Sequence, residues 1–189
     1  MRSIVVEPTA TAGWHSLVHE AEALCEQHLH QESESYLVFL LMRFLQRPEM
    51  GSRILATDYL ESFLAHGERR KENLREVGDH CLLFSGLFPQ IAERRRVKVS
   101  YYVNLGRSAY GVLSEEHHAQ LADMYQVLCE EFVPMMDVLQ AVRKLGQNQP
   151  NLNPLAALEL WLDTGSRQAL DSLGKTTSAT PVKGSGQRH

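Results

Sequence analysis

The chain has 189 residues, 43% of them hydrophobic, and a formal net charge of −4. This length fits a single domain with a real core, and the composition is ordinary for a soluble globular protein. The longest apolar run, YLVFLLM at 36–42, is far shorter than the ~20 residues that a membrane span needs. Cys25, Cys81 and Cys129 form no CxxC pair, which argues against a disulfide scaffold. We therefore expect a cytoplasmic protein without a membrane span.

Helical spacing of apolar residues begins at Trp14, after an N-terminal arm expected at 1–12. The run YLVFLLMRFL at 36–45 is apolar on nearly every face, which predicts the central helix of the fold. A later helix begins polar and becomes apolar from Cys81. In that helix Gly78 is expected to allow close approach of a neighbour, and Pro89 to close the element.

Residues 97–105 are ambiguous, because VKVSYYVNL alternates like a strand while its apolar residues also continue at helical spacing. We favour a helix over 99–113, since a lone strand would need a partner. Ser114 is then expected to cap a long helix that Pro134 kinks. Asn153 followed by Pro154 predicts another helix start.

Every firmly predicted element is helical and the connections between them are short, so neighbouring helices should pack antiparallel. The expected fold class is all-α, an irregular bundle of about six to eight helices. It should form a single helical domain over 13–173. The segment 174–189 is rich in Gly, Ser, Thr and Lys, and is expected to be a disordered C-terminal tail.

Positive charge gathers in one part of the chain. Residues 67–110 contain nine Lys or Arg and five Asp or Glu, whereas the remainder contains ten and eighteen. The candidate partner- or anion-binding residues are those of this junction: Arg94, Arg95, Arg96, Lys98, Tyr101, Asn104 and Arg107. Guanidinium forks suit carboxylates and phosphates. Alternatively, these cations pair with acidic residues of the same chain, such as Glu130 and Glu131.

The leading functional hypothesis is a non-enzymatic protein-interaction or regulatory module, whose basic, tyrosine-containing junction binds an acidic partner or an anion. The acidic total disfavours nucleic acid as the partner. We identify no catalytic residues in the sequence and expect no cofactor.

The alternative hypothesis is a metal- or cofactor-binding helical-bundle enzyme. Glu76 and His80 are four residues apart on one helix face, with Asp79 beside them, and such groups can ligate a metal or orient a general base. The competing interpretation is that Asp79 and His80 only satisfy buried helix contacts. Convergence of Asp79, His80, Asn104 and Arg107 on one pocket would favour the enzyme, and dispersal would favour packing and a surface patch.

Two other histidine pairs have ligand spacing. Glu115 and His118 form an ExxH pair, but only one such motif is present, and helical di-iron sites use two. His15 and His19 form an HxxxH pair that could hold Zn²⁺, although the pattern alone identifies no further ligand.

Two segments, ESYLVFLLMRFL and GDHCLLFSGLFPQIAERRRVKVSYYVNLGRSAY, are distinctive as text. Through these two segments the chain resembles a family of small uncharacterised bacterial all-helical proteins. The resemblance covers roughly residues 14–145. The resemblance implies a helical fold but no catalytic residue, because no activity is assigned to that family.

Overall fold

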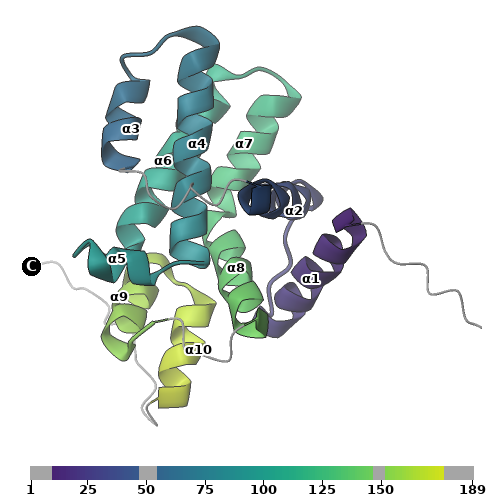
Figure 1. Ribbon diagram of the computed structural model, residues 1–189, viewed down its shortest axis with the longest axis vertical. Helices are drawn as coiled ribbons and strands as arrows, with labels where there is room; N and C mark the ends of the chain where they lie inside the picture. The colour runs from purple at the N-terminus through teal and green to yellow at the C-terminus, as the bar shows by residue number, and fades with distance from the viewer. Residues whose placement is uncertain (1–9, 47–54, 147–151, 177–189) are drawn as a thin grey trace, which may run out of the picture.

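The computed structural model describes residues 10–46, 55–146 and 152–176, and the regular secondary structure of this part of the chain is all helix, without a strand. Ten helices follow one another within it, as Figure 1 shows. Their bounds are α1 Ala10–Cys25, α2 Gln31–Gln46, α3 Leu55–Ser62, α4 Gly67–Gly86, α5 Gln90–Arg94, α6 Val99–Glu116, α7 Gln120–Glu130, α8 Phe132–Gly146, α9 Pro154–Thr164 and α10 Arg167–Thr176. The predicted all-α class is confirmed.

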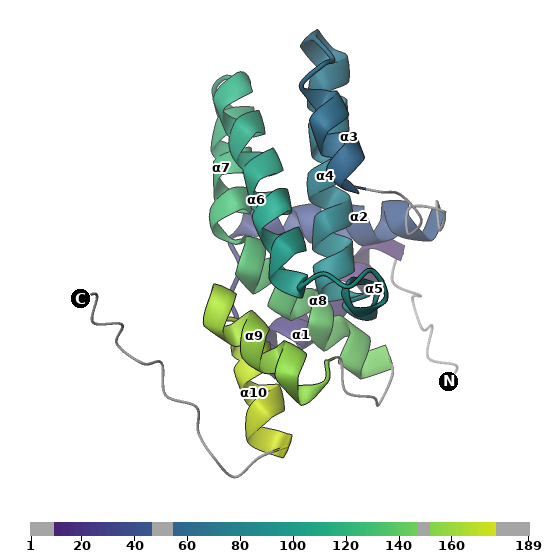
Figure 2. The ribbon, with the colours of Figure 1, turned by 90° about the vertical axis from the view of Figure 1, so that its left-hand side faces the viewer.

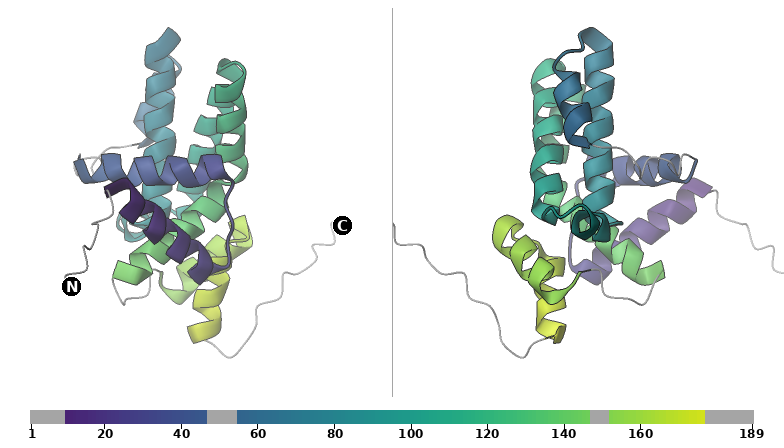
Figure 3. Two further views of the ribbon diagram at one scale, coloured as in Figure 1. Left: turned by 90° about the vertical axis from the view of Figure 1, so that its right-hand side faces the viewer. Right: turned by 60° about the vertical axis from the view of Figure 1, so that its left-hand side comes forward.

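Two helical hairpins, α3–α4 and α6–α7, project side by side from one end of the molecule (Figure 2). Helix α2 runs across them, roughly perpendicular to α4, while α1 and α8 lie below it (Figure 3). Helices α9 and α10 form a smaller pair that packs on the lower ends of α6 and α8. No helix in the described part of the chain is long and apolar enough to cross a membrane.

The centre of the fold is α4 rather than α2. Every residue from Val77 to Gly86 on α4 is buried, and this helix packs most extensively against α6. On α2, by contrast, Phe39 is 61% exposed. The prediction that α2 is central was wrong because apolar side chains on several faces do not show which faces receive neighbours.

Close packing of α4 on α6 depends on Gly78. A Cβ at this position would lie 2.3 Å from Cε1 of Tyr110, a distance that real Cβ atoms do not reach. The expected close approach is therefore present, and Pro89 follows the end of α4 as predicted, at the N-cap of α5.

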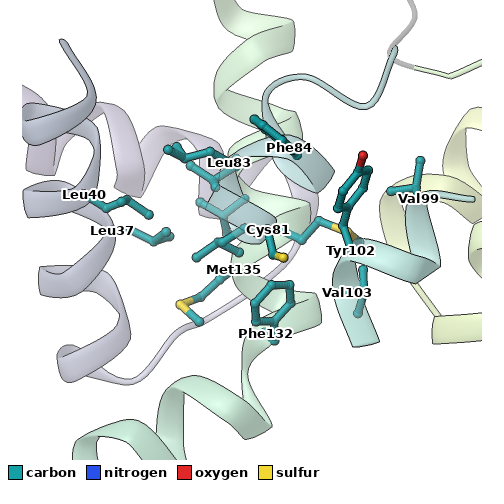
Figure 4. Close-up of a cluster of buried hydrophobic side chains, with 14 of the residues drawn as sticks. Leu37, Leu40, Cys81, Leu83, Phe84, Val99, Tyr102, Val103, Phe132 and Met135 are labelled. Carbon is teal, nitrogen blue, oxygen red and sulfur yellow. The ribbon is translucent and has the colours of Figure 1, made fainter. Parts of the chain in front are cut away.

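One part of the core joins residues of α2, α4, α6 and α8. Figure 4 shows Leu37 and Leu40 from α2 facing Cys81, Leu83 and Phe84 of α4, with side chains of α6 and α8 beyond. Helix α6 covers residues 99–105 of the ambiguous segment 97–105 and buries Tyr102, Val103 and Tyr110 at helical spacing. The helical interpretation of this segment is confirmed.

The helix boundaries near 114 differ from the prediction. Ser114 does not cap a new helix, because α6 continues to Glu116 and the Ser114 hydroxyl donates to the carbonyl of Gly111 in the preceding turn. Helix α7 begins only at Gln120, and a break at Glu131 separates it from α8. This break comes three residues before Pro134, in accord with the expected kink. The division of the predicted long helix into α7 and α8, together with the short α5, explains why the described chain has ten helices instead of the expected six to eight.

The first and last helices also extend slightly beyond the bounds predicted for the helical domain. Helix α1 begins at Ala10, inside the predicted arm, and α10 extends to Thr176, beyond the predicted domain end. Residues 1–9 and 177–189, where the rest of the arm and tail were predicted, lie outside the described residues. The predicted start of α9 is confirmed, since Asn153 accepts a 2.9 Å hydrogen bond from the amide of Ala156 and Pro154 follows it.

Candidate functional site

Asp79 lies at the meeting point of α2, α4 and α6 and is only 1% exposed. Its Oδ1 accepts hydrogen bonds from the hydroxyls of Tyr36 at 2.6 Å and Tyr110 at 2.8 Å. Its Oδ2 accepts from Nη2 of Arg43, also at 2.6 Å. We call these four residues the Asp79 hub. A buried carboxylate needs such donors, and here they come from helices on either side of α4.

Burial and the Asp79 side chain shift the pKa values of the other three residues of the Asp79 hub. Burial and the nearby Asp79 charge raise the pKa of Tyr36 and of Tyr110 well above the ordinary tyrosine value, so both stay protonated donors. Burial, the largest single influence, lowers the pKa of Arg43, but the charges and hydrogen bonds of Asp79 and Tyr36 together outweigh it, so the net shift is upward. Both phenols and the Arg43 guanidinium therefore remain hydrogen-bond donors to Asp79.

A pocket of about 520 Å³ opens beside the hub, between α2, α4 and α7. Most of its wall is apolar, and its polar groups are few. The lining residues are Tyr36, Phe39, Leu40, Met42, Arg43 and Gln46 from α2, Arg75 from α4, and Leu121, Met124 and Tyr125 from α7. This size and lining are typical of small-molecule sites.

Two guanidinium groups in the pocket wall have unused hydrogen-bonding capacity. The Nε atoms of Arg43 and Arg75 are buried and have no hydrogen-bond partner. An unsatisfied buried donor costs about 1–3 kcal/mol, which a bound acceptor would recover. Asp79 offsets the charge of Arg43, so Arg43, Arg75 and Asp79 together leave one positive charge at the pocket.

His80 does not join Asp79 in a ligand site. Its ring Nδ1 donates a 2.5 Å hydrogen bond to the Glu76 carbonyl, and the ring lies edge-on to Phe84. The Nε2 atom is buried without a hydrogen-bond partner. Glu76, Asp79 and His80 do not bring three donor atoms within 4.8 Å of one another, as a shared metal ion would require.

The arginines of the predicted junction diverge. Arg94 and Arg96 are exposed, whereas the Arg95 guanidinium packs over the ring of Phe84, 5.4 Å from its centroid. Arg96 has a left-handed backbone, with φ of 56°, and its amide donates to Glu93 while that of Val97 donates to Ala92. This pattern is a Schellman ending of α5, so the turn itself directs the three side chains apart.

The remaining junction residues lie along α6. Tyr101, Asn104 and Arg107 share its exposed face, at intervals of three residues. Arg107 donates a 3.3 Å hydrogen bond through Nε to the carbonyl of Cys129 on α7. Lys98 is different, because its Nζ lies 3.5 Å from a Glu159 oxygen and is thus paired within the chain.

The suggested pairing of the junction with Glu130 and Glu131 does not occur among the described residues. Glu131 accepts instead from the backbone amide of His30 and lies 2.7 Å from its ring Nδ1, and Glu130 accepts from the side chain of Gln126. Asp79 and His80 are buried while Asn104 and Arg107 face outward, so these four residues do not converge on one pocket.

Sequence reasoning missed the roles of Tyr36, Arg43, Arg75 and Tyr110. One signal was available, because Arg43 is the only charged residue within YLVFLLMRFL and Asp79 begins another apolar run. Charged residues in apolar helices are rarely buried unless they pair, so an Arg43–Asp79 ion pair was a reasonable inference. Arg75 carried no such signal, since it lies in the polar half of α4.

No protein-family model matches this chain, and no curated protein or solved structure is significantly similar to it. The resemblance to small bacterial helical proteins stays a prediction. Functional inference therefore depends on the geometry of the site.

Proposed function

We propose that this chain is a non-enzymatic helical binding module that takes up an apolar organic monoanion in the pocket between α2, α4 and α7. The observation that carries the proposal is the pair of arginines in its wall, each with a buried Nε that has no partner. The apolar side chains around them suit a hydrocarbon or aromatic body. The single excess positive charge suits one carboxylate better than a doubly charged phosphate.

A binding role is favoured over catalysis because the carboxylate of the hub, Asp79, is only 1% exposed and is not among the residues that line the pocket. Three donors occupy Asp79, and both tyrosines that contact it have a raised pKa. A general base needs a free lone pair within reach of the substrate. Asp79 instead holds Arg43 in place at the pocket wall.

Octanoate and its uncharged counterpart octanol are suitable probes, measured by calorimetric titration of the full chain. We expect saturable binding of octanoate that weakens about tenfold or more in Arg75→Gln, because a charge-assisted hydrogen bond contributes about 1.5–3 kcal/mol. Octanol should bind more weakly than octanoate. The matched control is Arg69→Gln, an exposed arginine on the same helix, which should leave affinity unchanged. Equal affinity for both probes, or for wild type and Arg75→Gln, would contradict the proposal.

A second candidate function is recognition of an acidic segment of a partner protein by the basic junction. It is favoured by the shared exposed face of Tyr101, Asn104 and Arg107 on α6, and by exposed Arg94 and Arg96, which form no ion pair within the described chain. Arg95 and Lys98 are omitted from this surface because the Arg95 guanidinium packs on Phe84 and the Lys98 charge is paired with Glu159, whereas Arg107 bonds an uncharged carbonyl and forms no ion pair among the described residues.

Charge reversal tests the junction. A labelled oligoglutamate peptide should bind wild type in a salt-dependent manner and should lose affinity about tenfold or more in the double variant Arg94→Glu, Arg107→Glu. Arg69→Glu changes the net charge in the same direction away from the junction and serves as control. If the double variant binds the peptide as well as wild type, or an oligoglutamine peptide binds equally, the junction is not an acidic-partner surface.

A further inference from the structure

Helix α1 presents His15, His19 and Glu22 on one face, at positions i, i+4 and i+7. Glu34 of α2 lies opposite this face. Its Oε1 is 2.9 Å from Nδ1 of His15 and 3.2 Å from Nε2 of His19. The ligand atoms of His19, Glu22 and Glu34 all lie within 4.8 Å of one another. The fold thus supplies the carboxylates that the HxxxH spacing alone could not identify.

Glu22 is only 6% exposed and is held in place by hydrogen bonds. Its Oε1 accepts a 2.9 Å hydrogen bond from the backbone amide of Leu29, and its Oε2 lies 3.0 Å from Nδ1 of His19. A carboxylate that fixes one ring nitrogen of a histidine, while the other nitrogen faces outward, is the usual support of a metal-ligating imidazole.

The His19 ring faces carboxylate oxygens through both nitrogens. A neutral imidazole has one N–H, so only one of these contacts is a hydrogen bond, and the other sets a lone pair against a carboxylate. A second proton on the ring, or a metal ion between Nε2 and Glu34, would remove this opposition. His19 is well exposed, so an ion bound there could complete its coordination with water.

We propose that His19, Glu22 and Glu34 hold a divalent first-row transition-metal ion of the Zn²⁺ class, with Glu22 also orienting the His19 ring and His15 contacting Glu34 beside them. Zinc bonds to nitrogen and oxygen of about 2.0–2.1 Å place tetrahedral ligand atoms about 3.3 Å apart. The His19 ring lies 3.0 Å from a Glu22 oxygen through Nδ1 and 3.2 Å from a Glu34 oxygen through Nε2, close to this separation. Mixed imidazole and carboxylate ligands suit Zn²⁺ better than Ca²⁺ or Mg²⁺, which prefer oxygen. This site is independent of the pocket proposed above.

The test is a Zn²⁺ titration of the full chain, freed of metal beforehand and competed against a chromophoric chelator at neutral pH. Wild type should bind one equivalent, and the affinity should fall about tenfold or more in His19→Ala and in Glu34→Gln. His28→Ala removes an exposed histidine outside this cluster and should leave the affinity unchanged. Circular dichroism verifies that each variant folds.

Thermal unfolding gives a second measurement, because an ion that binds only the folded state raises the melting temperature. Zn²⁺ should raise it for wild type and His28→Ala but not for His19→Ala. The proposal is overturned if no one-to-one binding is found, or if His19→Ala and Glu34→Gln bind as tightly as His28→Ala. The first outcome would assign the second proton, and thus a plain ion pair, to the contact between His19 and Glu34.

Discussion

The hydroxyl of Tyr110 donates a 2.8 Å hydrogen bond to Oδ1 of Asp79, and both side chains are buried. Tyr110→Phe removes this donor and leaves the ring in place. Since the acceptor is a buried carboxylate, we expect the free energy of unfolding to fall by about 1.5–3 kcal/mol. Chemical denaturation followed by circular dichroism measures this change.

Tyr101→Phe is the matched control for this substitution, because Tyr101 lies on the same helix and is 40% exposed. Its hydroxyl makes no contact with the Asp79 hub, so the variant should stay within about 0.5 kcal/mol of wild type. Similar losses in the two variants would show that the tyrosine hydroxyl matters through solvation and that the hub contributes little.

Gly78→Ala is expected to destabilise the fold even though alanine is the better helix former. Removing glycine gains about 1 kcal/mol of helix propensity. The added Cβ would meet Cε1 of Tyr110 at 2.3 Å, and overpacking of this kind costs about 1–3 kcal/mol or more. Tyr110 cannot move away without losing its bond to Asp79, so the cost should exceed the gain. The midpoint of urea unfolding measures the balance.

Gly13→Ala separates these two effects, because a Cβ there meets no atom within 4 Å. Only the propensity gain remains, and the variant should be more stable by up to about 1 kcal/mol. If Gly78→Ala raised the free energy of unfolding as much as Gly13→Ala does, α4 and α6 would not be in close contact at this position.

Local patterns predicted the order of the helices well. Pro89 and the Asn153–Pro154 start act through nearest neighbours in the chain, and each behaves as expected; Gly78 allows the close approach of a neighbour that its position predicted. The predicted helix boundaries were wrong where two local preferences compete. Ser114 is a good cap, but its hydroxyl also bonds readily to a carbonyl in the preceding helical turn, and burial of Leu113 favours continuation of α6.

The candidate sites could be predicted only in part, because their residues come from different helices. Helical spacing showed that His15 and His19 share a face, but only the packing of α1 on α2 brings Glu34 to them. Arg43 and Arg75 lie on helices whose crossing angle no local pattern specifies. The basic junction was visible as composition, yet the left-handed turn at Arg96 that spreads its arginines was not.

Asp137 should make stability depend on pH. Burial raises its pKa from 3.8 to about 6, although Ser166 and the amide of Arg167 donate hydrogen bonds to it. Because the folded state binds this proton more tightly, the stabilisation is complete below about pH 4 and is lost as the pH rises through 6. A shift of about two units corresponds to about 3 kcal/mol.

Asp137→Asn isolates this contribution, because asparagine does not titrate in this range. Its altered hydrogen bonds change stability by the same amount at every pH. We therefore expect the stability of the variant relative to wild type to rise by about 2–2.5 kcal/mol between pH 4 and pH 7, measured by urea denaturation at each pH. A difference that does not change with pH would show that Asp137 titrates normally.

The three thiols should differ in reactivity according to their burial. Burial raises the pKa of Cys25 to about 11 and that of Cys81 well above the ordinary value, so both are poor nucleophiles in the folded chain. Cys129 is only half-buried, with its Sγ 3.4 Å from the Arg107 carbonyl. Iodoacetamide under native conditions should therefore modify Cys129 first, as peptide mass spectrometry can measure. In denaturant the three rates should become similar, and native labelling of Cys81 as fast as Cys129 would contradict the buried core around α4.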